Sequence, residues 1–127
     1  EWDIERLQQA ELLHPTPDRR DWRRWLQATG LGERIALKGG QVFDTLELGM
    51  VAAARGYGVS IGDLVMVAED VAQGRLGLPW RSAVASGDSY YLVWPKARRG
   101  QARYHRLRDY LLAEVQAMQL PGVERLR

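Results

Sequence analysis

The sequence predicts an α/β domain with a mainly parallel sheet and helices on both faces of that sheet. Short apolar segments, typical of strands, alternate along the chain with capped amphipathic segments, typical of helices. This alternation is characteristic of parallel strands joined by helical crossovers. The length of 127 residues is enough for one compact domain. In such a sheet, ligands bind beyond the carboxyl ends of the strands.

The expected elements follow one another closely. In chain order they are a helix over 3–9, a strand over 11–14, a helix over 16–30, a strand over 34–38, a turn at 39–40, a helix over 46–54, a strand over 59–61, a helix from 63 to 74, a strand over 89–95 and a long helix over 101–119.

The helix over 16–30 is expected to begin at Thr16 as its N-cap and to stop at Gly30. Trp22, Trp25 and Leu26 then lie on one face with arginines opposite, so both tryptophans are predicted to be core residues.

The segment 42–63 contains the densest set of signals. Asp44 and Glu47 have the spacing of a capping box, and Phe43 and Leu48 have the spacing of a hydrophobic staple. Gly49, in mid-helix, predicts that a neighbouring backbone approaches closely. The chain must leave this helix and enter a strand within a few residues, so Gly56 or Gly58 is expected to have a positive φ.

The same segment contains G-V-S-I-G, which matches the G-x-S-x-G pattern of hydrolases, and Asp88 and His105 follow in triad order. The context disfavours this interpretation, because Ser60 alternates with apolar residues as in a strand and the turn comes later, at Gly62. An acyl hydrolase using Ser60 is therefore kept as an alternative, and no catalytic residue is assigned.

Composition excludes several classes of function. There is no Cys, so disulfides and thiol chemistry are absent, and the two histidines have no metal-ligand spacing. No cofactor and no metal are expected. No apolar run approaches the ~18–20 residues of a membrane span. The net charge of +2 does not indicate nucleic acid, and the paired arginines are interpreted as solvated faces, with a phosphate- or partner-binding patch as the alternative.

The helix N-terminus near Thr45 is the candidate binding position. Its hydroxyl, beside free backbone amides, suits a carboxylate or a sugar hydroxyl. The alternative is an ordinary helix cap. His14 is expected to be a polar residue at a strand end, or alternatively to line a cleft.

Five segments in the right order resemble the effector-binding domain of LysR-type transcriptional regulators, in the branch of the glycine-cleavage activator and the β-lactamase regulator. The resemblance covers about residues 11–115, and the segments are LLH, DWRRWLQATG, FDTLELGMVAAARGYGVSIGD, VAQGRLGLPW and YYLVWP.

The resemblance implies one lobe of a type 2 periplasmic-binding-protein-like domain, with the effector held between two lobes. Residues 11–94 correspond to the second lobe, and helices within 1–10 and 101–119 are expected to pack on a first lobe that the chain mostly lacks. The residues that match the family's effector contacts are Thr16, Phe43, Asp44, Thr45 and Tyr90.

The function implied is non-enzymatic sensing of a small effector in a cytoplasmic, oligomeric regulator. Such a regulator would bind DNA through a domain absent from this chain and would have no membrane contact. A stand-alone solute-binding lobe is a further alternative. The chain does not begin with Met, so we expect it to start inside a longer protein.

The last helix carries a long apolar stripe that needs a partner. We expect it to pack on residues 3–9 or on a second copy of the chain. The stripe consists of Tyr104, Leu107, Leu111, Val115 and Met118.

Overall fold

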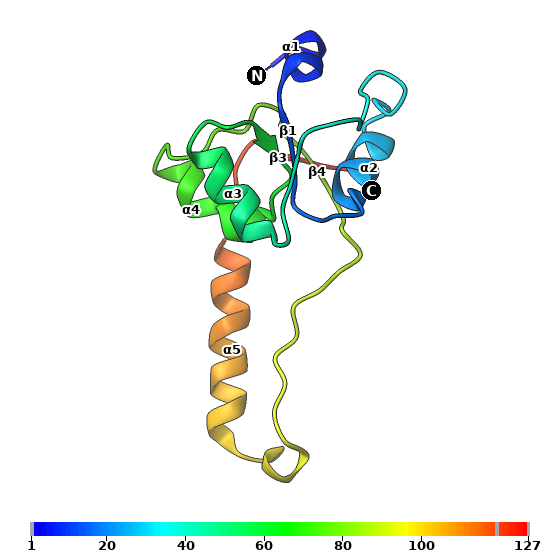
Figure 1. Ribbon diagram of the computed structural model, residues 1–127. Helices are drawn as coiled ribbons and strands as arrows, with labels where there is room; N and C mark the ends of the chain where they lie inside the picture. The colour runs from blue at the N-terminus through cyan, green and yellow to red at the C-terminus, as the bar shows by residue number, and fades with distance from the viewer. Residues whose placement is uncertain (1, 119, 127) are drawn as a thin grey trace.

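The computed structural model describes residues 2–118 and 120–126 (Figure 1). Its helices and strands alternate over most of the chain. They are α1 (Ile4–Gln9), β1 (Leu12–His14), α2 (Arg20–Ala28), β2 (Gln41–Val42), α3 (Leu46–Ala54), β3 (Val59–Ser60), α4 (Leu64–Ala72), β4 (Ser82–Val84), the 3₁₀ turn η1 (Lys96–Arg98), α5 (Ala102–Ala117) and β5 (Glu124–Leu126).

All strand pairs are parallel, as the sequence predicted. The main sheet has the order β2-β1-β3, and its register sets Leu13 opposite Gln41 and Leu12 opposite Val59. A second small sheet pairs β4 with β5. The strand order reverses at β1, which makes the carboxyl end of β1 the switch point of the sheet.

Helices cover both faces of the main sheet because successive side chains of β1 point to opposite sides. Leu12 joins a core cluster with Trp22 of α2, whereas Leu13 faces α3 across a pocket. Figure 1 shows α2 on one side of β1 and β3, with α3 and α4 on the other. The predicted α/β class is therefore confirmed.

The core lies on the α2 side and is built around tryptophan. The rings of Trp22 and Trp25 meet edge to face at 5.8 Å, and Trp25 meets Trp80 in the same way at 5.9 Å. Both indole N–H groups are satisfied, since Trp22 donates to the Leu13 carbonyl and Trp25 to the Ser82 carbonyl, each at 2.9 Å. The prediction that Trp22 and Trp25 are core residues is confirmed.

Several local signals act as predicted. Gly30, with φ +71°, ends α2 in a Schellman motif, in which the Leu31 amide donates to the Leu26 carbonyl at 2.9 Å. Asp63 caps α4, and Gly56 has φ +80°. Gly49 is buried, but the group that approaches it closely is a side chain and not the predicted backbone: a methyl group there would lie 3.1 Å from the Ser60 hydroxyl and 3.8 Å from the nearest backbone atom, the Cα of Pro15.

Two predicted strands are wrong. Residues 34–38 form turns and irregular chain, with Ile35 buried in the core, and the strand begins only at Gln41, after two left-handed glycines. Residues 89–95 are extended but pair with no strand among the described residues. The β4–β5 pair was not predicted, because each strand is only three residues long and the paired residues, such as Ser82 and Glu124, are 42 positions apart in sequence.

An arm, residues 86–118, leaves the body as an extended segment and returns as α5 (Figure 1). At its far end Trp94 stacks on Tyr104, with ring centroids 5.9 Å apart. Leu107, Leu111 and Val115 are exposed, so the expectation that this helix folds back onto residues 3–9 is wrong. The two apolar residues of α1 belong instead to the body's own core, where Leu7 is buried and Ile4 packs against the same cluster. In the described part of the chain, no helix is long and apolar enough to span a membrane.

Candidate functional site

The candidate site lies where the strands of the main sheet end. Since β1, β2 and β3 are parallel, the loops that follow them leave from the same edge of the sheet. Thr16 follows β1, Phe43, Asp44 and Thr45 follow β2, and Asp63 follows β3. The arm leaves the body on this same side (Figure 1).

Thr45 is the N-cap of α3, which corrects the prediction that Asp44 has this role. The Thr45 hydroxyl accepts a hydrogen bond from the Leu48 amide at 3.3 Å. With the cap one residue later than expected, the predicted capping box and hydrophobic staple both lose their spacing. Thr45 is exposed, and its hydroxyl donates to no acceptor within the described residues. Helix geometry also leaves the Leu46 and Glu47 amides without intrahelical partners.

Thr16 does not cap α2, which begins only at Arg20. The Arg19 amide donates to the Thr16 carbonyl at 3.0 Å and closes a turn, and Arg19 itself has φ 57°. The Thr16 hydroxyl lies 2.8 Å from Asp18 and 3.0 Å from Asp21. The hydrogen bond from Thr16, followed by that from the Arg20 amide, lowers the pKa of Asp18. Thr16 is therefore half-buried at the edge and engaged with two carboxylates.

Tyr90 lies beside the start of α4 and not in a strand. It is 77% exposed, and its hydroxyl lies 3.4 Å from the sulfur of Met66. The negative charge of Asp63, with smaller effects of burial and of a hydrogen bond to the same carboxylate, raises the pKa of Tyr90. The phenol of Tyr90, which belongs to the arm, thus lies near Asp63 in the loop between β3 and α4.

His14 is the last residue of β1, as predicted, and it is buried beneath this edge, so it does not line a cleft. Its Nε2 donates to the Gly39 carbonyl at 3.0 Å, and Nδ1 has no partner among the described residues. Burial is the main cause that lowers the pKa of His14. A metal role finds no support, since the described residues contain no group of three potential ligands.

The residues of the hydrolase alternative lie in separate parts of the molecule. Ser60 ends β3 and donates to the Ile61 carbonyl at 3.2 Å, and no helix begins until Leu64. Asp88 lies in the loop after β4, whereas His105 is in the first turn of α5 and bonds to the Arg99 carbonyl at 3.1 Å. A nucleophile elbow requires a sharp strand-to-helix turn at the serine, and this geometry does not provide one.

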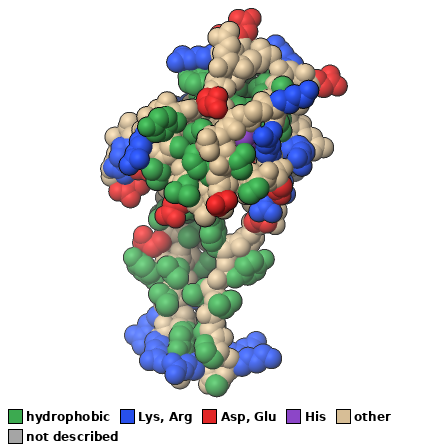
Figure 2. Space-filling view, in the orientation of Figure 1, with side chains coloured by type: hydrophobic (Ala, Val, Ile, Leu, Met, Phe, Trp, Pro, Cys, Tyr) green, Lys and Arg blue, Asp and Glu red, His purple; other side chains and the backbone are tan. Residues whose placement is uncertain are grey.

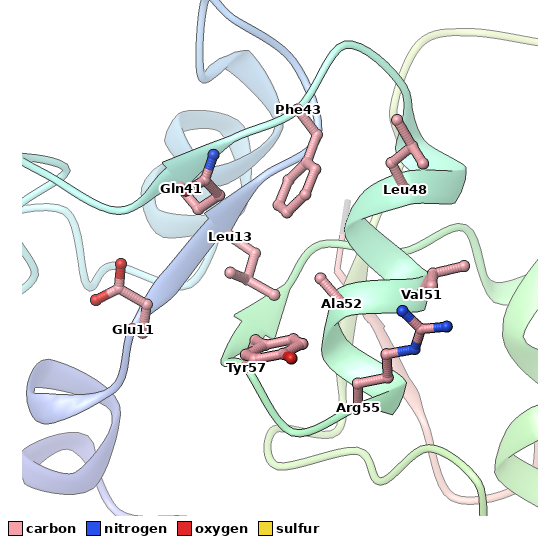
Figure 3. A pocket seen from close by; sticks show the side chains of 9 residues that line it. All are labelled: Glu11, Leu13, Gln41, Phe43, Leu48, Val51, Ala52, Arg55 and Tyr57. Atoms are coloured by element: carbon pink, nitrogen blue, oxygen red, sulfur yellow. The ribbon is translucent and has the colours of Figure 1, made fainter.

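An open pocket of about 500 Å³ adjoins the start of α3, on the sheet face opposite α2. Phe43 and Leu48 lie at one end, near the α3 N-terminus, and the rings of Phe43 and Tyr57 point toward Leu13 (Figure 3). Arg55 and Glu11 are the charged residues of its lining. Of the predicted effector contacts only Phe43 lines this pocket. Four of the other lining residues share one face of α3 at helical spacing, namely Leu48, Val51, Ala52 and Arg55. Their approach to Leu13 and Gln41 depends on how α3 packs on the sheet, which the sequence did not predict.

Comparison with known protein families assigns the chain to one of them. The model of the LysR substrate binding domain matches residues 1–116. The chain belongs to this family. The predicted resemblance is thereby confirmed, and with it the periplasmic-binding-protein-like fold class.

Curated relatives agree with this assignment. This LysR domain is 36% identical over 110 residues to the HTH-type transcriptional regulator TrpI of Pseudomonas aeruginosa. It is 30% identical over 115 residues to the glycine cleavage system transcriptional activator of Escherichia coli K12. These alignments cover 87% and 91% of this chain but only 36% and 37% of the relatives, so the chain spans about a third of their length. No solved structure matches this chain at the level of significance that these curated relatives reach.

Proposed function

We propose that this LysR domain is the effector-sensing part of a cytoplasmic DNA-binding transcriptional regulator, and that it has no catalytic activity. The family match and the two regulators similar to it support this role. In this proposal, a small molecule binds at the carboxyl edge of the main sheet and a domain outside the chain binds DNA. The regulator acts as a homo-oligomer and has no membrane contact.

The observation that carries the effector site is the exposed N-terminus of α3. Three donors converge there, namely the Thr45 hydroxyl and the amides of Leu46 and Glu47. The positive end of the helix dipole adds to their preference for an anion. We therefore propose that the effector carries a carboxylate, with its apolar part toward Phe43.

Thr16, Asp44 and Tyr90 complete the proposed site as neighbours of this carboxylate position. Asp44 and the pair Asp18–Asp21 beside Thr16 place negative charge at the same edge. A ligand with both a carboxylate and an ammonium group satisfies both charges, so α-amino acids are the first class to test.

The test uses the full-length regulator and a panel of α-amino acids in a thermal-shift assay. We expect at least one amino acid to raise Tm, and Thr45→Val to abolish that rise. Thr45→Val also removes a helix cap, at a cost of about 1 kcal/mol. Asp3→Ala provides the matched control, because Asp3 caps α1 far from this edge, where its carboxylate accepts from the Arg6 amide at 2.8 Å.

Asp3→Ala should lower Tm as Thr45→Val does, yet keep the ligand-dependent rise. Thr45→Ser retains the hydroxyl, so it should keep both the stability of the unmodified protein and the ligand-dependent rise in Tm. If Thr45→Val loses stability while the ligand response persists, the hydroxyl is only a cap, and the effector site at α3 is wrong.

A further inference from the structure

His14 holds the stretch of chain that leads into the candidate effector edge. We call residues 37–43 the β2 segment; it contains β2 and ends at Phe43, two residues before Thr45. The Nε2 of His14 donates to the Gly39 carbonyl at 3.0 Å, and the backbone carbonyl of His14 accepts from the Phe43 amide at 2.8 Å. One buried residue therefore holds the β2 segment both at its turn and where it reaches the candidate site.

The β2 segment passes so close to His14 that only glycine fits at the point of contact. Gly39 and Gly40 are both left-handed, with φ +83° and +80°. A Cβ at Gly40 would collide with the Leu12 carbonyl and would lie 2.8 Å from the Nε2 of His14. The ring and the segment are thus in direct contact, so a change at the ring acts on the path of the segment.

The hydrogen bond to Gly39 determines which nitrogen of His14 carries the hydrogen. A carbonyl oxygen only accepts, so Nε2 is protonated and Nδ1 has a free lone pair, which has no partner among the described residues. Figure 2 shows acidic and basic side chains spread over the surface of the body, whereas His14 is fully buried. A proton on Nδ1 would therefore place a charged N–H group without an acceptor in the interior.

The charges that act on His14 do not compensate for this proton. Burial has the largest influence and lowers the pKa of His14, while the bond to the Gly39 carbonyl raises that pKa by less. The positive charge of Arg19, in the turn before α2, lowers the pKa further, and Glu11, before β1, raises it least. The Arg19 guanidinium also donates to the Leu37 carbonyl, at the start of the β2 segment.

The other charged residues of the neighbouring elements have different positions or partners. On the α2 side, Asp18 and Asp21 both accept from the Thr16 hydroxyl. Lys38, in the β2 segment, and Asp44, directly after it, are both exposed. These residues therefore leave the proton on Nδ1 uncompensated unless the surrounding chain moves.

The β2 segment is the part of this surrounding chain that moves most easily. β2 has only two residues, lies at the end of the sheet order, and follows two exposed glycines. On the other side β1 is tied to the core, because the Trp22 indole donates to the Leu13 carbonyl at 2.9 Å. Local opening of an exposed segment needs less free energy than opening of a packed core.

We propose that His14 is a proton-sensitive positioning residue of the effector edge. The neutral ring holds the β2 segment over the end of β1, and a proton on Nδ1 releases this segment together with Phe43 and the start of α3. The inference rests on the proposed function, which places the effector beside Phe43 and Thr45. Because the effector needs the closed segment, the proton and the effector oppose each other, and effector binding weakens as pH falls.

The experiment measures hydrogen–deuterium exchange of the full-length regulator, without effector, at about pH 7.5 and 5.5. Mass spectrometry follows the peptide 39–48, which covers the site, and the peptide 20–28, which reports on α2 and the core. Rates are corrected for the intrinsic pH dependence of amide exchange. His14→Gln is the test variant, because the Gln amide can donate to the Gly39 carbonyl but does not titrate. His105→Gln removes the other histidine and is the matched control.

We expect the peptide 39–48 to exchange faster than the peptide 20–28 at both pH values, because it opens locally. Its corrected rate should rise by up to about tenfold at the lower pH, since each opening exposes a ring that then takes up one proton. His14→Gln should abolish this rise, and His105→Gln should retain it. This result would show that the pH-dependent opening is local to the site and originates at His14.

Three results would overturn the proposal. The first is a corrected rate of the peptide 39–48 that is equal at both pH values in the unmodified protein, which decides the matter even if His14→Gln does not fold. The second is equal rates of the two peptides, which would mean that the β2 segment opens only when the body unfolds and that His14 is merely structural. The third is a rise that persists in His14→Gln. The assay contains no effector, so its failure leaves the proposed sensing role standing, and failure of the Thr45 test leaves these exchange rates unaffected.

Discussion

At the scale of single residues, His14 is the most constrained polar group of the candidate edge. It is fully buried, with one ring nitrogen donating to the Gly39 carbonyl and the other without a partner among the described residues. A charged imidazolium at this position would lose its hydration without gaining a carboxylate. The fold therefore holds the neutral form, and the pKa of His14 is lowered chiefly by burial.

This burial predicts how stability depends on pH. The folded pKa lies below the unfolded value of 6.5, so the unfolded chain binds more protons as pH falls through that range. Stability from neutral His14 is therefore fully present above pH 6.5 and is lost as pH falls toward the folded pKa. Urea unfolding at about pH 7.5 and 5.5 should show less stability at the lower pH, and His14→Gln should reduce this difference.

His105→Gln is the matched control, because His105 is the other histidine and lies in the arm. It should keep the pH dependence of the unmodified chain. If His105→Gln reduces the difference and His14→Gln does not, burial of His14 is not the cause.

At the scale of elements, α1 shows how a short helix depends on tertiary contacts. Six residues are too few for a stable isolated helix. Asp3 caps it, and Leu7, only 2% exposed, anchors it in the cluster that contains Leu12 and Trp22. α1 is thus part of the body's core, and the predicted division into lobes at residue 11 stays a prediction.

Leu7→Ala should lower the free energy of unfolding by about 2–5 kcal/mol, because a cavity replaces a fully buried side chain. Leu48→Ala makes the same change on α3, where Leu48 is 52% exposed, and should cost less than about 1 kcal/mol. Chemical denaturation of the two variants measures this difference. Equal small losses would show that α1 is not part of the cooperative fold.

At the scale of the whole molecule, the arm presents more apolar surface than an isolated chain is expected to leave in water. Leu107, Leu111 and Val115 are between 38% and 50% exposed, and Tyr91 and Val93 of the extended segment exceed 80%. A continuous apolar face of this kind marks an interaction surface. Each such side chain contributes about 1.5–3 kcal/mol when fully buried.

We predict that this 127-residue chain associates through α5 with a second copy at micromolar concentration, as sedimentation would show. Leu111→Asp should dissociate the assembly, because it places a charge in the buried stripe. Ala113→Asp adds the same charge on another side of the helix and should leave association intact. A monomer at these concentrations would contradict the prediction.

Local signals in the sequence were enough to locate most helices and their ends. Gly30, Asp63 and Gly56 act through backbone conformation or through an amide a few residues away, so their effects can be read from neighbouring residues. The periodic Trp22, Trp25 and Leu26 likewise determined the core face of α2. The family was identified from the resemblance of five segments that occur in the right order along the chain, and no single residue was enough to identify it.

Only the tertiary structure decided the pairing of strands and the details of the site. Paired residues of β4 and β5 are 42 positions apart in sequence. Residues 89–95 have strand composition but no strand beside them among the described residues. Both outcomes depend on long-range partners, which local pattern does not encode. Thr45, and not the predicted Asp44, is the N-cap of α3, because the helical hydrogen bonds begin one residue later than expected. The burial of His14 depends on the chain that passes over it at Gly39, which only the fold brings into contact.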